Sequence, residues 1–258
     1  MPGGFQKTLR HQKGKGRDML RGGYTCYGQD IGIMMLDTSF PRMKGDIGNA
    51  LTFPFPVRYK IVRNVFQGAS LPRDADAVLL NAFREAAKEL EADGCKAITT
   101  SCGFLAGFQK ELAEAVHIPV FTSTLALIPM IYPMLGKNQT IAVFTEKKEF
   151  MTESLFNKNG WSAKNIPVTV WGMDENSAFN DLIIRNSSEG DLDRIRKEVE
   201  QISVRFHETE KNCGAIVLEC QNLSPFGKTI QDITGLPVFG INQLITFMRN
   251  AVSYPDYN

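Results

Sequence analysis

The sequence predicts an α/β protein with two similar lobes, each a short, mostly parallel sheet flanked by helices, and a cleft between them. Three observations support this prediction. The chain has 258 residues, 43% of them apolar, which suffices for one large or two modest domains. Short β-branched runs alternate with amphipathic helical stretches, as in parallel sheets covered by helices. One segment recurs in the second half of the chain, so we expect a pseudo-twofold axis between the lobes.

Seven short apolar runs are predicted to be strands, because turn-forming and polar residues bound them. They cover residues 31–36, 96–101, 119–122, 140–144, 167–171, 215–218 and 237–239. Two longer stretches, 74–93 and 193–211, place apolar residues at helical spacing. Gly94 follows the first stretch and predicts where that helix stops.

An internal repeat divides the chain. Residues 94–121 align with residues 212–239 without a gap, and ten of the 28 pairs are identical. Two of the identical pairs are cysteines, which similar composition alone does not require. The repeat predicts a duplication in which each half is β-α-β-α-β. We expect lobe one to hold residues 24–122 plus 241–258, and lobe two to hold residues 123–240.

The charges are balanced overall but not along the chain. Lys and Arg total 29 and Asp and Glu total 28, which excludes the strongly basic surface of a protein that coats nucleic acid. Residues 1–23 hold six basic side chains and one acidic one, and they predict a mobile basic leader that lacks the apolar core of a secretory signal. The longest later apolar stretch, 125–135, contains two prolines and falls far short of the roughly 20 residues that span a bilayer. We therefore expect a cytoplasmic protein that binds neither nucleic acid nor a membrane.

The five cysteines predict free thiols in a reducing compartment, because their number is odd and no export signal is present. No pair has C-x-x-C spacing and the three histidines lie far apart in the sequence, so we expect no metal site. Cys95 and Cys213 enter their strands at the amino end and are expected to be core residues. Cys26 is expected to be structural.

Cys102 and Cys220 are the candidate catalytic residues. Each ends an apolar strand and precedes a segment that can begin a helix, and ligands of parallel sheets bind at the carboxyl ends of the strands. The positive end of a helix dipole predicts that the pKa of each thiol is lowered toward 7 to 8. A thiolate and a thiol on opposite sides of a carbon could remove a proton from one face and return it to the other. Backbone N–H groups after each cysteine, with the side chains of Thr100, Ser101 and Asn222, are expected to bind the carboxylate oxygens.

These residues resemble the aspartate/glutamate racemase superfamily, which includes hydantoin racemase, maleate isomerase and arylmalonate decarboxylase. Cys102 in TTSCGF and Cys220 in LECQN match its two cysteine positions. Asp37 in MLDTS is similar to the acidic residue after the first strand, and Thr145 in AVFT to a threonine after the first strand of the second lobe. The resemblance implies catalysis without a cofactor and a homodimer. A helix or turn cap explains Asp37 equally well.

Departures from the racemase pattern leave the substrate open. Gly103-Phe104 and Gln221-Asn222 follow the two cysteines, where glutamate racemases have Asn-Thr and Thr-His. These four positions are therefore candidate substrate-binding residues with an altered specificity. The segment 41–62 is expected to be a loop that covers the cleft, where Arg42, Lys44 or Arg58 are candidates for binding a carboxylate.

The sequence thus favours a cofactor-independent racemase or epimerase acting on a carbon next to a carboxylate, in an amino acid or a related small acid. One alternative is an isomerase or decarboxylase of a small dicarboxylic acid on the same fold. The other is a bilobed protein that binds a small molecule without catalysis, which would have ordinary thiols.

Overall fold

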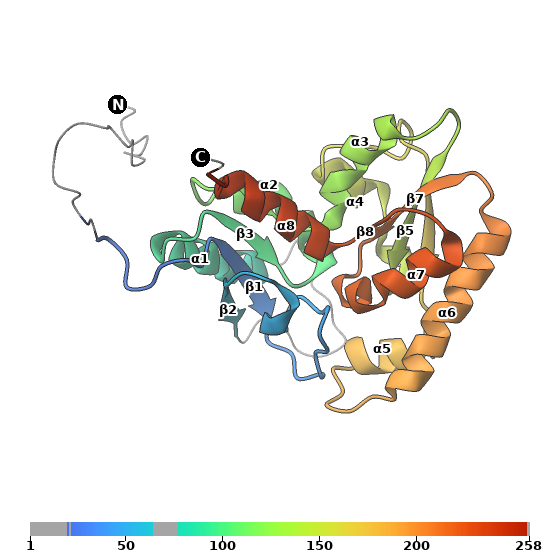
Figure 1. Ribbon diagram of the computed structural model, residues 1–258, viewed down its shortest axis with the longest axis horizontal. Coiled ribbons are helices and arrows are strands. Elements are labelled where there is room, and N and C mark those ends of the chain that lie inside the picture. Colours follow the sequence, from blue (N-terminus) through green and yellow to red (C-terminus); the bar gives the residue numbers. More distant parts are fainter. Residues whose placement is uncertain (1–19, 21, 64–76, 257–258) are drawn as a thin grey trace.

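The computed structural model describes residues 20, 22–63 and 77–256. Nearly all of the predicted basic leader lies outside these residues. Within them the chain forms two sheets with helices around them (Figure 1). None of the described helices has the length and apolar character needed to cross a bilayer.

Each sheet has four parallel strands. The first has the order β2-β1-β3-β4 and comprises β1 (Ile31–Leu36), β2 (Val57–Val62), β3 (Ala97–Thr100) and β4 (Val120–Phe121). The second has the order β6-β5-β7-β8 and comprises β5 (Thr140–Thr145), β6 (Val168–Gly172), β7 (Cys213–Leu218) and β8 (Val238–Phe239). The equivalent strand orders confirm the predicted α/β class with two related sheets.

Helices lie on both sides of the sheets. The α-helices are α1 (Ala77–Ala92), α2 (Gln109–Ala113), α3 (Ile128–Ile131), α4 (Glu153–Lys158), α5 (Ala178–Ile183), α6 (Leu192–Thr209), α7 (Gly227–Thr234) and α8 (Ile241–Val252). Short 3₁₀ helices are η1 (Ala50–Thr52), η2 (Gly103–Phe108), η3 (Thr124–Leu127), η4 (Tyr132–Met134), η5 (Lys148–Phe150) and η6 (Gln221–Phe226). Gly94 has a φ of +93° directly after α1, the left-handed conformation expected of a helix stop.

The repeat seen in the sequence is also a repeat of structure. η2 and η6 begin directly after Cys102 and Cys220 and have the same length. β4 and β8 occupy the matching positions at the end of each copy. The two cysteines therefore hold equivalent places in the two halves of the fold.

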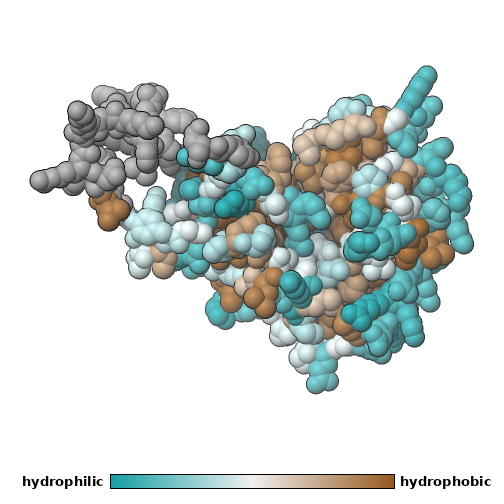
Figure 2. Space-filling view, in the orientation of Figure 1, coloured by the Kyte–Doolittle hydropathy of each residue, from teal (hydrophilic) through white to brown (hydrophobic). Residues whose placement is uncertain are grey.

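Alternating side chains of the central strands build the core on two sides, as the period of a strand requires. In β1, Ile31 and Ile33 join a cluster that also contains Ile141 and Val143 of β5, whereas Met34 packs in the cluster beneath α1. The first cluster therefore draws on both sheets. α6 covers the outer side of the second sheet, and its solvent face is mostly hydrophilic at the right edge of Figure 2.

The structure corrects one expectation about segment 41–62. Its second part is the edge strand β2 and not a cover for the cleft. Val57 and Val62 are buried, while Arg58 and Lys60 form ion pairs with Asp93 and Glu89. The sequence did not predict this strand because charged residues interrupt its apolar pattern. Such charged side chains are typical of a strand at the edge of a sheet.

The last helix returns to the first sheet. α8 lies beside β3 (Figure 1), and Lys96 Nζ donates to Ser253 Oγ just after the helix, at 3.0 Å. Asn242 of α8 also donates through Nδ2 to the carbonyl oxygen of Gly45, at 2.7 Å. The end of the chain thereby holds the loop after β1 in place.

Candidate active site

The carboxyl ends of both sheets meet at one small cavity of about 30 Å³. Its walls come from the residues after three central strands, from the loop after β1 and from the end of α5. They are Leu36, Thr38, Phe40, Arg42, Ser101, Cys102, Glu146, Ile183, Ile184 and Asn222. This is the edge at which parallel sheets bind ligands.

Cys102 lies on the cavity wall at the start of η2. Burial raises the pKa of its thiol well above the usual range, and the charge of Glu146 raises it further, whereas hydrogen bonds from the backbone N–H groups of Phe104 and Leu105 lower it. The predicted lowering of this pKa is therefore wrong for the structure as described. The helix end acts in the expected direction, but loss of hydration outweighs it.

Cys220 lies behind the wall and is 4% exposed. Its thiol donates a hydrogen bond to Oε2 of Glu146 at 3.0 Å, and Asn222 Nδ2 lies 3.9 Å from its sulfur. Burial and the charges of Glu146 and Glu219 raise the pKa of this thiol, again against the sequence prediction. The structure thus connects Cys220 to the cavity through Glu146 and Asn222, two residues that line it.

Two buried carboxyl groups follow the central strands of the second sheet. Burial raises the pKa of Glu146 to about 7, against the effects of the Cys220 hydrogen bond and the charge of Lys147. Burial also raises the pKa of Glu219 to about 8, although Thr145 Oγ1 donates to its Oε2 at 2.6 Å. Both groups therefore exchange protons in the range where most enzymes work.

The absence of a side chain at Gly103 makes room for Glu219. A Cβ atom added to Gly103 would overlap the carbonyl oxygen and Oε1 of Glu219. Oε1 of Glu219 has no hydrogen-bond partner among the described residues. The residue after the first cysteine is therefore a glycine because a carboxyl group from the other lobe packs against it.

Arg42 supplies a positive charge to the cavity. Its Nη1 forms an ion pair with Asp46 at 2.7 Å, its Nη2 donates to Thr38 Oγ1 at 2.8 Å, and its guanidinium lies 4.3 Å from the centre of the Phe40 ring. These contacts fix the guanidinium group of Arg42 on the cavity wall.

The other two carboxylate-binding candidates lie elsewhere. Lys44 is exposed, and Arg58, on the edge strand β2, forms an ion pair with Asp93. Of the three carboxylate-binding candidates in segment 41–62, only Arg42 lines this cavity.

The other predicted substrate-binding residues divide into two groups. Ser101 and Asn222 line the cavity. Thr100 instead donates to the carbonyl oxygen of Thr122 at 2.8 Å, and Gln221 is buried.

Phe104 and Asp37 also lie off this wall. Phe104 packs edge to face against Phe150, with ring centres 5.0 Å apart. Asp37 is exposed and pairs with Arg63 at 3.5 Å. Its position after β1 matches the prediction, but its carboxylate does not line this cavity.

Sequence reasoning missed Glu146 and Glu219 as members of the site. One signal was available, because each acidic residue directly follows a buried strand of the second sheet. A buried strand seldom continues into a carboxylate that stays buried. No group of three or more potential metal ligands occurs among the residues that the structure describes.

The arrangement of strands and helices is similar to that of several solved structures. Among solved structures, an allantoin racemase from Klebsiella pneumoniae has a TM-score of 0.59 at 14% identity and covers 88% of this chain and 95% of its own. An arylmalonate decarboxylase without ligand has a TM-score of 0.57 at 13% identity, over 89% and 94% of the two chains. An aspartate racemase homologue from Pyrococcus horikoshii OT3 has a TM-score of 0.54 at 16% identity, over 87% and 99%.

The chain has the aspartate/glutamate racemase fold.

Proteins of similar sequence are named as lyases and not as racemases. A dimethylsulfoniopropionate lyase 7 of Emiliania huxleyi (strain CCMP1516) is 26% identical over 240 residues, which is 90% of this chain and 70% of the relative. A dimethylsulfoniopropionate lyase of Durusdinium sp. clade D is 26% identical over 233 residues, which is 88% and 76% of the two chains. No family model matches the chain. The racemase fold therefore occurs here with relatives that are named as lyases.

Proposed function

We propose that this protein is a lyase that removes a proton next to a carboxylate and expels a leaving group from the neighbouring carbon. The first candidate substrate is dimethylsulfoniopropionate, by analogy with the relatives. One observation carries the proposal. Cys102, Glu146 and Arg42 line one cavity at the edge where the two sheets meet, which supports a role for a thiol, a carboxyl group and a cation around one ligand.

The reaction balances with the groups at hand. A thiolate at Cys102 would take the proton from the carbon next to the carboxylate, and the C–H electrons would form the double bond. The bond from the β carbon to sulfur breaks, and its electron pair leaves with the sulfur. The products are dimethyl sulfide, acrylate and one proton on the enzyme. No oxidant, reductant or proton donor is needed, because dimethyl sulfide leaves as a neutral molecule.

The raised pKa of the Cys102 thiol keeps it protonated at neutral pH in the absence of a ligand, so the proposed base forms only when a bound ligand lowers this pKa. Once formed, a thiolate whose conjugate acid has a high pKa is a strong base. A cationic substrate beside Cys102 favours the thiolate, since a nearby positive charge lowers a thiol pKa. Arg42 would hold the carboxylate and stabilise the charge that develops on its oxygens.

The cavity must enlarge for this chemistry. About 30 Å³ holds one or two water molecules, whereas the candidate substrate is several times larger. Ile183 and Ile184, at the end of α5, line the cavity together with residues of the segment 38–42. We expect these two segments to separate when a ligand enters.

Incubation with dimethylsulfoniopropionate tests the proposal directly. Dimethyl sulfide is measured in the headspace by gas chromatography and acrylate by proton NMR, and the two should appear in equal amounts. The Cys102→Ala variant sets the background. Product formation no faster than this background would contradict the lyase assignment.

A racemase or epimerase that uses two cysteines is the second candidate. The placement of Cys220 at the repeat position of Cys102, one hydrogen bond behind the cavity wall, favours it. In heavy water a racemase would exchange the α-hydrogen of a chiral acid and form both enantiomers. A lyase would release an unsaturated acid. A cytoplasmic location and a homodimer stay predictions.

A further inference from the structure

The cavity carries opposite charges on different segments. Arg42 comes from the loop after β1 in the first lobe, and Glu146 follows β5 in the second. Arg42 already has a partner in Asp46 at 2.7 Å. Glu146 is 5% exposed, and no Lys or Arg among the described residues forms an ion pair with it.

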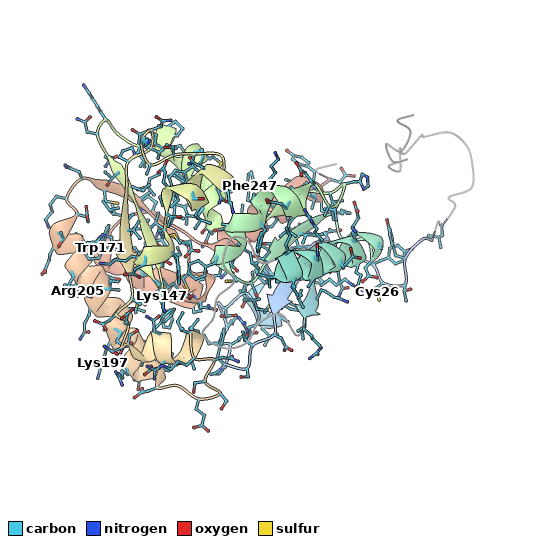
Figure 3. The ribbon with its side chains drawn as sticks, turned by 180° about the vertical axis from the view of Figure 1, so that it is seen from behind. Cys26, Lys147, Trp171, Lys197, Arg205 and Phe247 are labelled. Atoms are coloured by element: carbon cyan, nitrogen blue, oxygen red, sulfur yellow. The ribbon has the colours of Figure 1, made fainter. Side chains whose placement is uncertain are left out.

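The Glu146 carboxyl group has a weak hydrogen-bond donor beside it and shares the cavity with an acceptor that has no partner. The hydrogen bond that the Glu146 carboxyl group accepts from the described residues comes from the weakly donating Cys220 thiol. Oδ1 of Asn222, on the same wall, has no partner among the described residues. Lys147 follows Glu146, but its ammonium lies over the Phe150 ring at 5.8 Å from the ring centre (its position is labelled in Figure 3). A buried carboxylate without a cationic partner is costly, so a cation in the cavity would be favourable.

Building on the proposed lyase reaction, we infer that Glu146 selects substrates with a positively charged group two carbons from the carboxylate. Arg42 would hold the carboxylate and Glu146 the cationic end, so that the cavity is complementary to a zwitterion. Ile183 and Ile184 supply apolar surface to the same cavity, as the methyl groups of an onium ion require. The proposed ligand class is therefore small carboxylates that carry a methylated sulfonium or ammonium group.

Two probes of the same shape separate charge from size. 3-(Trimethylammonio)propionate carries the cationic centre, and 4,4-dimethylpentanoate has a neutral carbon in its place. Both keep the carboxylate, and neither contains a sulfonium leaving group. Binding of each is measured by isothermal titration calorimetry to wild-type protein and to the Glu146→Gln variant. Glutamine keeps the size of the side chain and an oxygen that can accept from Cys220.

Glu149→Gln is the matched control. Glu149 lies three residues further along the same segment and is exposed, so it tests loss of a negative charge outside the cavity. Wild type and Glu149→Gln should bind the ammonium compound roughly tenfold or more tightly than the neutral one, since a buried charge pair contributes at least a factor of ten. In Glu146→Gln this preference should fall to about threefold or less.

The outcomes distinguish this inference from the lyase assignment. A wild-type preference for the ammonium probe that Glu146→Gln abolishes supports the inference, even if dimethylsulfoniopropionate gives no dimethyl sulfide. Equal binding of the two probes by the wild type overturns it. A preference that Glu146→Gln keeps also overturns it, even in a protein that is an active lyase.

Discussion

The thiol of Cys220 donates a hydrogen bond to Oε2 of Glu146 across 3.0 Å. This contact joins the second cysteine of the repeat to a carboxyl group on the cavity wall, so the two duplicated cysteines are not used alike in the structure. Cys102 lines the cavity itself, and Cys220 reaches it through a neighbour. Where the repeat predicts a symmetric thiol pair, the structure has an asymmetric arrangement that includes the carboxyl group of Glu146.

Replacing Cys102 should remove the base. We expect Cys102→Ser to lower kcat roughly a hundred- to ten-thousandfold, the usual contribution of a general base, because a serine hydroxyl does not ionise near neutral pH. Steady-state release of dimethyl sulfide measures this. Cys26→Ser is the control, since Cys26 is exposed and lies away from Lys147 in Figure 3. Equal loss in both variants would point to damage unrelated to the cavity.

Two substitutions of Cys220 test its hydrogen bond to Glu146. Serine keeps a donor to Glu146, and alanine removes it, so Cys220→Ser should retain about tenfold more activity than Cys220→Ala if the side chain acts by positioning Glu146. The pH profile of kcat should shift in the alanine variant and stay close to wild type in the serine variant. Equal, complete loss in both would make the Cys220 thiol an acid or base in its own right.

Arg42 should govern affinity for the carboxylate. Arg42→Gln is expected to raise KM roughly ten- to hundredfold, because a hydrogen bond to a charged group contributes about 1.5 to 3 kcal/mol. Lys44→Gln removes a positive charge from an exposed position two residues along the same loop and should leave KM within about twofold. An unchanged KM in Arg42→Gln would place carboxylate binding elsewhere.

Gly103→Ala should destabilise the protein. The added methyl group would meet the carbonyl oxygen and Oε1 of Glu219, and the backbone oxygen cannot move without shifting β7. Overpacking of this kind costs about 1 to 3 kcal/mol of unfolding free energy, which urea denaturation measures. Gly23→Ala is the control, because a Cβ there meets nothing within 4 Å. A Gly103→Ala variant as stable as Gly23→Ala would show that the two lobes separate easily at this contact.

Glu219 should make stability depend on pH. Its pKa is about 8 in the folded protein against an ordinary value of 4.5, so the folded state holds a proton that the unfolded state has lost between these values. The unfolding free energy should therefore fall as the pH rises from about 5 to about 8. Urea titrations across this range measure it, and Glu219→Gln should flatten the slope. A slope unchanged in this variant would assign the effect to other groups.

The sequence predicted the fold well where local pattern and burial agree. β1 lies at residues 31–36 as expected. A short continuous run of apolar residues is typical of a strand buried on both faces of a parallel sheet. β2 was missed because its charged side chains face α1 and solvent, and their pairing with Asp93 and Glu89 requires the helix to be placed first. Local patterns do not contain such contacts.

The site was predicted in position but not in electrostatics. The repeat located both cysteines at the ends of their strands, where the structure has them. The direction of their pKa shifts depends on burial and on Glu146 and Glu219. Glu146 is distant in sequence from both cysteines, and Glu219 is distant from Cys102. Asp37 shows the opposite case, since its place after β1 was correct but its carboxylate turns to Arg63.

The residues after the two cysteines differ most where the repeat would be expected to keep them alike. Gly103 leaves room for Glu219 of the other half, whereas Asn222 lines the cavity. Once a duplicated gene encloses one cavity from both copies, each copy is free to specialise as long as the other compensates. The differences between the halves therefore show that the two copies contribute different groups to one cavity. Exchanging residues 103–104 with 221–222 should disturb the packing of both copies.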